Sequence, residues 1–306
     1  MSIIVKANSQ NSLVNDQVSG FFGADYKEPE SLYSKIATEY GSDSSSERMV
    51  ESDNFGNFGV KPEGAAGQKQ SLQDGYTVDF NIQTYSNSYP ISDEAVDDNK
   101  KQGSILDIER NNVKLSNAMV RTKDLLVSNV YNNAFSTAVA GGDGAPLISS
   151  SHPTPVGNQA NRLATSAEFS QTAIEELFNL ISKAKDRRGN FVSLKVKALM
   201  VPTELQFQAM KLLQTDKEVG SANNDVNILS TSFNGNRMDL VVNPYLTSAT
   251  KYYLITDNDQ GVVYYNRDAG ELTTFNDHAE KVTNVLMTFR CATGFADWRG
   301  VYGSGE

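Results

Sequence analysis

A long amphipathic pattern over residues 104–140 is the only extended regular element that the sequence predicts. Its apolar positions are Ile108, Leu115, Met119, Leu126 and Val130. Steps of seven and four residues keep such positions on one face of a helix. No glycine or proline interrupts the segment, and Gly141-Gly142 ends it. We therefore predict a helix of about 54 Å, at about 1.5 Å per residue, along which the rest of the fold is laid.

The basic residues of this segment fall mostly outside the apolar stripe and are expected in solvent. They are Arg110, Lys114, Arg121 and Lys123. A coiled coil is the alternative for a helix of this length. Only this one segment is periodic, however, and its polar positions lack alternating charge. The pattern favours one long helix within a globular fold.

The first 48 residues are polar and rich in serine, asparagine, aspartate and glycine, with one weak amphipathic piece at residues 32–40. Such a composition predicts an N-terminal arm, not a domain. Stretched out, about 46 residues reach on the order of 150 Å, so the arm can cross onto neighbouring subunits. A terminus without any partner is the alternative.

Recurring glycines between Phe55 and Gly75 define a second unusual stretch. After it, residues 76–82 alternate apolar and polar side chains, as in a strand. About 20 residues without a core of their own are unusual inside a compact domain, so they are either disordered or held by another molecule. We predict a two-stranded extended loop over residues 49–83.

The remaining chain mixes helical and strand patterns, which predicts an α+β fold. Three helices are expected: one over 92–96 that Ser92 caps, one over 167–184 that Ser166 caps and Gly189 ends, and one over 204–213. The expected strands are 194–201, 240–242, 252–256, 262–265 and 282–291. In the last strand, Val285, Met287 and Phe289 are expected to face inward. Residues 257–261 are expected to form a hairpin turn, and the basic cluster 183–188 to form the C-terminal turn of a helix.

Composition narrows the class of protein. At 306 residues with 39% apolar content, the chain exceeds one average domain, so we expect two lobes. The formal net charge of −10 argues against a protein that grips nucleic acid, which needs a basic face. A single cysteine forbids an internal disulfide. No apolar stretch is long enough for a membrane span or a classical signal, so we expect a soluble protein.

Metal sites are not predicted. His152, His278 and Cys291 do not stand at helical ligand spacing, which excludes an ordinary zinc site. The segment after Asp257 resembles a calcium loop, but it lacks the glycine at the sixth position and the closing glutamate.

Catalysis is not predicted either. Ser151 beside His152 suggests a hydrolase, yet no G-x-S-x-G elbow surrounds them. The glycines at 141, 142 and 144 lack the Lys-Ser/Thr of a phosphate loop. The pair Trp298-Arg299 offers a stacking surface, but packing near the chain end is the simpler interpretation. We expect no enzyme, no catalytic residue, no cofactor and no metal.

Six short motifs carry a resemblance to a known family. They are Gly142-Asp143-Gly144-Ala145-Pro146-Leu147, Ser151-His152-Pro153 with Asn161, Val201-Pro202, Asn224-Asp225-Val226-Asn227, Val242-Asn243-Pro244-Tyr245-Leu246 and Asp297-Trp298-Arg299-Gly300-Val301-Tyr302-Gly303. Each motif is weak alone, but their order and spacing are fairly specific. From about residue 50 to 303 the chain resembles tailed-bacteriophage major capsid proteins, in particular the branch with the Mu-like major head subunit.

The resemblance implies the fold named after phage Hong Kong 97. Its parts would be an N-terminal arm (1–48), an extended loop (49–83), a peripheral domain (84–144 and 261–291) with the spine helix 104–140, and an axial domain (145–260 and 292–306). We expect intersubunit contacts at Phe55, Phe58, Lys61 and Lys69 of the loop. Structural roles are expected for the motif residues Gly142, Asp143, Gly144, His152, Pro153, Pro244, Trp298 and Arg299.

The expected function is that of a major capsid protein, found in the virion and assembled in the cytoplasm of the host bacterium. Copies would form hexamers and pentamers of an icosahedral head around double-stranded DNA, enclosed without sequence-specific binding. Portal and scaffolding proteins are expected partners, a decoration protein is a further candidate, and no membrane is involved. An acidic subunit suits this task, because a lining that repels DNA does not pin it.

Two features depart from some relatives, and one rival shares the fold. The short polar start leaves no room for a helical scaffolding segment, so we expect that scaffolding comes from a separate protein or that the coding sequence is processed differently. Covalent cross-links need a loop lysine facing a neighbour's asparagine; Lys61 and Lys69 lie in the loop, but the sequence does not supply the partner.

The rival function is an encapsulin-like nanocompartment that encloses cargo enzymes, and a hydrolase using Ser151 and His152 is a second alternative.

Overall fold

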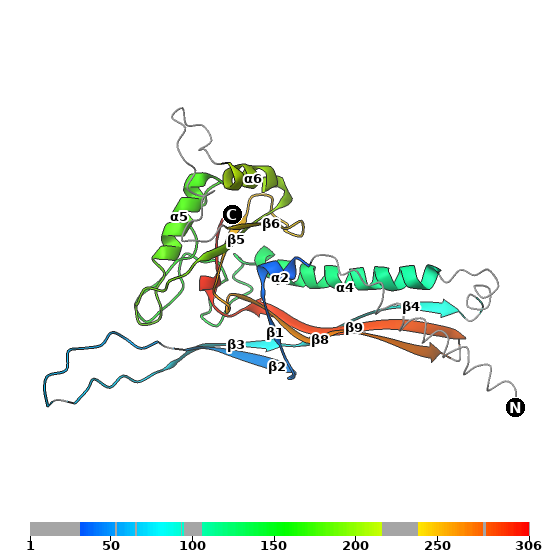
Figure 1. The fold of residues 1–306 in the computed structure, drawn as a ribbon, viewed down its shortest axis with the longest axis horizontal. Coiled ribbons are helices and arrows are strands. Elements are labelled where there is room, and N and C mark those ends of the chain that lie inside the picture. The colour runs from blue at the N-terminus through cyan, green and yellow to red at the C-terminus, as the bar shows by residue number, and fades with distance from the viewer. Residues whose placement is uncertain are drawn as a thin grey trace.

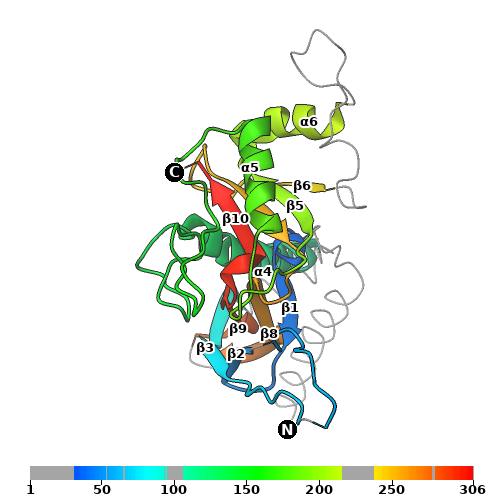
Figure 2. The same cartoon turned by 90° about the vertical axis from the view of Figure 1, so that its left-hand side faces the viewer.

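The computed structural model of the chain describes residues 31–52, 54–64, 66–92, 94, 106–215, 238–277 and 280–305. These residues form two lobes and a projection (Figure 1). The lower lobe is a long four-stranded sheet with one helix lying along its face, and the upper lobe is a second four-stranded sheet with two helices. A two-stranded ribbon extends from the lower lobe into a long loop. Figure 2 shows the upper lobe standing over the helix and sheet of the lower one.

The lower sheet has the strand order β1-β8-β9-β4. Its strands are β1 (Thr38–Gly41), β4 (Gln83–Ser92), β8 (Val262–Asp277) and β9 (Val282–Phe295). The predicted inward residues of β9, Val285, Met287 and Phe289, are all buried. Strand β4 tolerates Pro90 because it lies at the sheet edge, where a missing backbone donor breaks no ladder.

Strand β8 is much longer than the predicted 262–265. The pairing of β8 with β9 shifts register between Asn266 and Glu271. This irregular stretch contains charged residues and a glycine, which obscure the strand pattern in the sequence. Beyond it, β8 pairs with β9 again as far as Asp277.

The long helix is α4 (Leu106–Asn132), about 40 Å long, and it ends at Asn132 although the sequence predicts position 140. Tertiary hydrogen bonds explain the early end. The Asn132 side chain donates to the Tyr245 carbonyl (3.1 Å) and accepts from the Thr247 N–H (3.0 Å). Two residues on, the Ala134 carbonyl accepts from the Ile148 N–H (2.8 Å), so a neighbouring loop takes over the backbone hydrogen bonding.

The buried face of α4 differs in part from the predicted stripe. Leu115 and Met119 are buried as predicted, whereas Leu126 and Val130 are only partly buried. Val127 and Tyr131 have no exposed surface. In the second half of the helix, Val127 and Tyr131 therefore face the core in place of their neighbours Leu126 and Val130. The sequence does not reveal this choice, because both residues of each pair are apolar.

Lys123 was wrongly expected in solvent, because it is 3% exposed. Its ammonium donates to the Ala269 carbonyl at 2.9 Å. It also lies 5.9 Å from the ring centre of Tyr33 and 5.6 Å from that of Phe289. These contacts replace part of the water that a buried cation loses. The side chains of Ile108 and Arg110 lie outside the described residues.

Val127→Ala is expected to lower the free energy of unfolding by about 2 kcal/mol, because two fully buried methyl groups are lost and a small cavity remains. Leu125→Ala, at a position that is 39% exposed on the same helix, serves as the control and should change stability by less than about 0.5 kcal/mol. Denaturant unfolding of both variants measures the difference. Equal losses would contradict the assignment of the buried face.

The upper sheet has the order β10-β7-β5-β6. Its elements are α5 (Gln171–Ser182), β5 (Val196–Val201), η1 (Thr203–Leu205), α6 (Gln206–Gln214), β6 (Asp239–Val242), β7 (Tyr252–Thr256), η2 (Trp298–Gly300) and β10 (Val301–Ser304). The predicted strands in this region are confirmed, and the helix predicted at 204–213 is η1 followed by α6. Helix α5 starts later than predicted, because the Ser170 hydroxyl, not that of Ser166, caps it by accepting from Ala173 N–H (3.2 Å).

The turn at residues 257–261 is not a hairpin, which corrects the prediction. Strand β7 before it belongs to the upper sheet, and β8 after it belongs to the lower sheet. The turn therefore joins the two lobes. It passes so close to η2 that a Cβ on Gly300 would lie 2.2 Å from the Cα of Gly261, so both positions require glycine.

Residues 31–48 of the expected arm contribute to the lower lobe. The short helix α2 (Tyr33–Ile36) packs on α4, with the Tyr33 N–H donating to Asp124 Oδ1 at 2.9 Å. Strand β1 then pairs in parallel with β8. Residues 1–30, His278 and the motif at 224–227 lie outside the described residues, as does most of the helix expected at 92–96; Ser92 is the last residue of β4.

Candidate functional site at the base of the extended loop

The projecting ribbon consists of β2 (Ser46–Ser52) and β3 (Asp74–Asn81), which pair antiparallel. The loop between them exposes its large apolar side chains: Phe58 and Val60 have essentially all of their surface in solvent, and Phe55 has 63%. Lys61 and Lys69 are exposed as well. The loop thus presents apolar and cationic side chains with no core beneath them.

The base of the loop rests on a hairpin of the upper lobe at residues 185–191. The Arg188 guanidinium donates to Gln70 Oε1 (3.3 Å) and to the Ser71 carbonyl. Gln70 Oε1 also accepts from the Gly56 N–H (2.7 Å), which ties the two sides of the loop together. The cluster 183–188 was wrongly interpreted as a helix end only, because part of it holds the loop.

Asp186 is the acceptor at the centre of this hairpin. Its carboxylate accepts from the Asn190 and Arg188 N–H groups (2.8 and 2.9 Å) and from the side chains of Asn190 and Asn54 (3.0 and 3.4 Å). Burial alone raises the pKa of Asp186, but these hydrogen bonds outweigh it and hold the pKa below its usual value. Asn54 belongs to the loop, so the hairpin carboxylate also binds the loop base.

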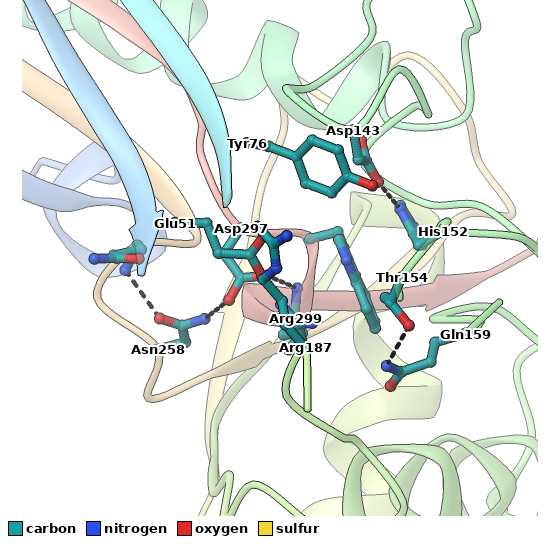
Figure 3. Close-up of polar contacts among 12 residues, drawn as sticks. Glu51, Tyr76, Asp143, His152, Thr154, Gln159, Arg187, Asn258, Asp297 and Arg299 are labelled. Atoms are coloured by element: carbon teal, nitrogen blue, oxygen red, sulfur yellow. Dashed lines mark hydrogen bonds and ion pairs between the residues drawn. The ribbon is translucent and has the colours of Figure 1, made fainter. Parts of the chain in front are cut away.

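A charged cluster joins the stem of the ribbon to the upper lobe (Figure 3). Glu51 of β2 accepts from Arg299 (3.2 Å) through one oxygen and faces Arg187 (3.6 Å) through the other. Arg299 also pairs with Asp297 (2.9 Å) and donates to the Lys185 carbonyl (2.9 Å). One carboxylate on the ribbon is thus shared by two arginines from the upper lobe.

Arg299 is 5% exposed and keeps its charge because of its partners. Burial by itself lowers the pKa of the guanidinium, but the carboxylates of Asp297 and Glu51 outweigh that effect and raise it. Its Cζ lies 4.6 Å from the ring centre of Trp298. Removing Glu51 would leave a buried cation with fewer partners, which is the usual reason for a large loss of stability at such sites.

A buried polar network lies beside this cluster. His152 has no exposed surface, and its Nδ1 is 2.6 Å from Asp143 Oδ2 (Figure 3). Its Nε2 is 3.1 Å from Asn161 Oδ1, which also accepts from the Ser149 N–H (2.8 Å). The Asn161 amide nitrogen lies within hydrogen-bond distance of three carbonyls, those of Leu147 (2.7 Å), Trp298 (3.1 Å) and Val301 (2.8 Å).

His152 cannot serve a hydrolase. Both of its ring nitrogens are engaged by Asp143 and Asn161, so neither is left to take a proton from Ser151, whose side chain is exposed. The imidazole also stacks on the indole of Trp298, with ring centres 4.4 Å apart and planes 8° apart. The network is therefore structural: it joins the loop after α4 to the chain end.

Two glycines let the ribbon approach these elements closely. A Cβ on Gly142 would lie 3.0 Å from the Thr77 carbonyl of β3. A Cβ on Gly75 would lie 2.0 Å from Arg187 Nη1. The Tyr76 hydroxyl donates to the Pro153 carbonyl (2.8 Å), so two motif residues, Gly142 and Pro153, contact the ribbon. The site fixes the angle at which the loop leaves the body.

The comparison with protein families agrees with this architecture. The profile of a family described as "Phage capsid protein" matches residues 75–304. The chain belongs to the phage capsid protein family. No curated protein matches the sequence.

Solved structures place this capsid protein in the Hong Kong 97-like fold. It is similar to the capsid of the native GTA particle (TM-score 0.53, 12% identity, covering 92% of this chain and 94% of that one). It is also similar to a structure titled "Microbacterium phage Oxtober96" (0.51, 13%, 92% and 93%) and to the virus-like particle from Pyrococcus furiosus (0.51, 9%, 94% and 96%). At these identities the likeness shows the fold alone, while the family makes the chain a structural protein of a virion and not an enzyme.

The structure brings most of the predicted motif residues of this capsid protein together, but not all. Asp143, His152, Trp298 and Arg299 lie in the joined networks, and Gly142 and Pro153 touch the ribbon. Gly144 is exposed and has a positive φ of 77°, a turn conformation that suits glycine. Pro244 is exposed; the residue before it, Asn243, donates to Ser128 of α4 (2.9 Å).

Several residues of the site were missed as site residues, among them Asp186 and Arg188 of the hairpin and Gln70 of the loop. Glu51 and Arg187 carry no local signal, because charged residues at these positions are read as solvated. Asn161 stands in a motif, but only its full burial and its hydrogen bonds show that it joins the loop after α4 to the chain end.

Metal and membrane sites do not change this assignment. Within the described ranges no group of three or more histidine, cysteine or acidic side chains could hold a metal ion. Cys291 is buried, and burial raises the pKa of its thiol, which makes it a poor ligand. Among the helices of the described part of the chain, none has the length and apolar character to cross a bilayer.

Proposed function

We propose that this protein is the major capsid protein of a tailed double-stranded DNA bacteriophage, and that its copies form the hexamers and pentamers of an icosahedral head. The observation that carries the proposal is the extended loop. Phe58 and Val60 are essentially fully exposed, while the base of the loop is held by ion pairs and hydrogen bonds to the upper lobe. A loop held at its base and bare at its tip is built to contact another molecule.

The contact partner is a neighbouring subunit. A long two-stranded projection is marginal in water by itself, so its order depends on contacts beyond the ribbon. Burying one large apolar side chain contributes about 1.5–3 kcal/mol, and a shell repeats this contact at every subunit. Phe55, Phe58, Lys61 and Lys69 are the loop residues that we assign to this interface.

The parts of the fold take the roles that the family resemblance implies. The lower lobe is the peripheral domain (84–144 and 261–291) with α4 as spine, and the upper lobe is the axial domain (145–260 and 292–306). Strand β9 runs on to Phe295 in the lower sheet, so this boundary lies a few residues later than 291. The part of the expected arm (1–48) that the structure describes begins with α2 and β1, which pack on this subunit's own lower lobe, so the loop (49–83) is the part that we assign to contacts with a neighbour.

The acidic surface suits enclosed DNA. A formal net charge of −10 per subunit disfavours tight binding of packaged phosphate chains. Portal and scaffolding proteins are the partners that a phage head requires, and assembly takes place in the bacterial cytoplasm.

Electron microscopy of the purified protein tests the proposal. The full-length chain is expressed alone and together with the scaffolding gene of its own genome. Closed shells whose reconstruction contains both hexamers and pentamers are expected. A protein that stays monomeric under both conditions would overturn the proposal, and so would shells that hold a co-purified enzyme, since that outcome identifies a nanocompartment.

A further inference from the structure

A cavity of about 180 Å³ lies between α4 and the edge of the lower sheet. Ser86, Asn87 and Thr122 give it a polar part, and its apolar lining comes from Leu115 and Met119 of α4, Tyr85 of β4, and Met287 and Phe289 of β9. Apart from Tyr85, these side chains are almost hidden from solvent. Figure 1 shows α4 lying over β4 and β9, the three elements that carry these residues.

The size and lining of the cavity fit one phenyl ring. An apolar protein cavity of about 150 Å³ binds benzene. Aromatic walls and methionine sulfurs favour an aromatic guest, and here the rings of Tyr85 and Phe289 stack with centres 5.2 Å apart beside two methionines. No charged side chain lines the cavity. A neutral aromatic side chain placed in this space would bury its own apolar surface and that of the walls, which stabilises the lobe.

The segment that precedes the first described residue contains such a side chain close at hand. In residues 1–30 the only phenylalanines are Phe21 and Phe22, within the uncharged stretch 19–23. The third ring of this segment, Tyr26, stands between the charged residues Asp25 and Lys27, which suit an uncharged lining less well. The described chain begins at Ser31, and Tyr33 is bound to Asp124 of α4. Asp124 is five residues along the helix from Met119, a rise of about 7.5 Å.

The tether is more than long enough. Eleven residues separate Phe22 from Tyr33, and such a stretch spans up to about 36 Å. A short tether also raises the local concentration of the ring, and this effect falls as the tether lengthens. Leu13, Val14 and Val18 are apolar too, as are the more distant Ile3 and Ile4, but the aromatic lining favours a ring over an aliphatic side chain.

We propose that the Phe21-Phe22 pair of the chain's own N-terminal segment anchors this segment on the peripheral lobe by placing one phenyl ring in the cavity between α4, β4 and β9. This proposal does not require the shell, because the cavity and the segment belong to one chain.

Photo-crosslinking in the full-length protein tests the anchor. Phe22→p-benzoylphenylalanine places a benzophenone at the anchor, and irradiation joins it to nearby C–H bonds, with methionine side chains as preferred targets. Tandem mass spectrometry is expected to find the crosslinks on the peptides that contain Met119 and Met287. The same probe at position 21 covers the case that Phe21 is the inserted ring, and Ile4→p-benzoylphenylalanine is the control for a probe on a longer tether.

A variant in which a larger side chain on α4 fills the cavity provides the matched comparison with the wild-type lining. Ala118 lines the cavity, and Ala118→Leu or Ala118→Phe occupies it. The yield at Met119 and Met287 is expected to fall about ten-fold, since a packed interior has no room for a second ring. Two sizes of filler are used so that at least one variant keeps the wild-type melting transition. An unchanged yield in a folded filler variant would overturn the proposal.

Isotope labelling identifies the occupant. In an equal mixture of ¹⁵N-labelled and unlabelled chains, crosslinks within one chain join peptides of the same label. Mixed pairs would overturn the proposal and assign the site to the segment of a second copy. Capture of Met119 or Met287 by a probe at Phe58 would overturn it in favour of the extended loop. Crosslinks at positions 21 and 22 that map elsewhere also overturn it, while intact shells in the same sample would leave the proposed function standing.

Discussion

Shell formation is expected to be lost when residues 56–74 are replaced by a short Gly-Ser linker, while the unassembled subunit keeps its circular dichroism spectrum and melting transition. The loop has no buried core, since Phe58 and Val60 are essentially fully exposed, so its removal takes nothing from either hydrophobic core. Shortening a loop changes the closure entropy by only tenths to about one kcal/mol. Glu51, which carries the ion pairs to Arg299 and Arg187, remains in place.

The matched control keeps the loop and changes only its tip. Phe58→Ser with Val60→Ser removes the exposed apolar surface and leaves the contacts of Gln70 and Ser71 with Arg188. We expect fragile shells or none, judged by electron microscopy and by the temperature at which particles dissociate. Normal, equally heat-resistant shells from the linker variant would refute the intersubunit role, and a linker variant that fails to fold would refute the independence of the loop from the core.

Asn161→Ala is expected to lower the free energy of unfolding by about 5 kcal/mol, which is a large part of the stability of a typical domain. The substitution leaves the carbonyls of Leu147 and Val301, the Ser149 N–H and His152 Nε2 without their shared partner. Each buried group left unsatisfied costs about 1–3 kcal/mol. Because Asn161 is fully buried, water reaches these groups only if the structure opens.

Asn158→Ala provides the control for this substitution. Asn158 is an exposed asparagine in the same loop, so its removal should change stability by less than about 0.5 kcal/mol. Denaturant unfolding of unassembled subunits compares the two variants. A loss below about 1 kcal/mol for Asn161→Ala would mean that the network does not join the chain end to the loop after α4.

The loop tip and the Asn161 network differ in how they depend on assembly. The loop tip acts between subunits, and its test reads out shells. The Asn161 network acts within one subunit, and its test reads out unfolding. Loss of shells in the loop variant, together with loss of stability in the Asn161→Ala variant, would separate the two roles.

Local periodicity was enough to predict several elements. The spacing of apolar residues predicted α4 and its buried Leu115 and Met119, and strict alternation predicted β9 with its inward Val285 and Met287. In both cases one face of a regular element meets the core, so burial repeats with the period of the backbone. The glycine-rich stretch after Phe55 predicted a projection without a core for the same reason: it has no apolar period to bury.

The interactions between elements could not be predicted in this way. Lys123 is buried because Ala269 and two aromatic rings from other elements surround it, and none of these is near it in sequence. Glu51 meets Arg299 across most of the length of the chain. The turn at 257–261 looks like a hairpin locally, but its strands enter different sheets.

The sequence by itself determined the α+β class, the long helix, the projecting loop and, through the order of its motifs, the family. The first three properties follow from local backbone preferences and from the period of apolar residues, which neighbouring residues encode, whereas the family follows from the resemblance of the motifs. Only the tertiary structure decided where α4 ends, which face of it is buried in its second half, and how His152, Asn161, Arg299 and Glu51 hold the base of the loop. Those outcomes depend on contacts between residues far apart in the chain, and a buried polar group can be recognised only when its partners have been brought to it.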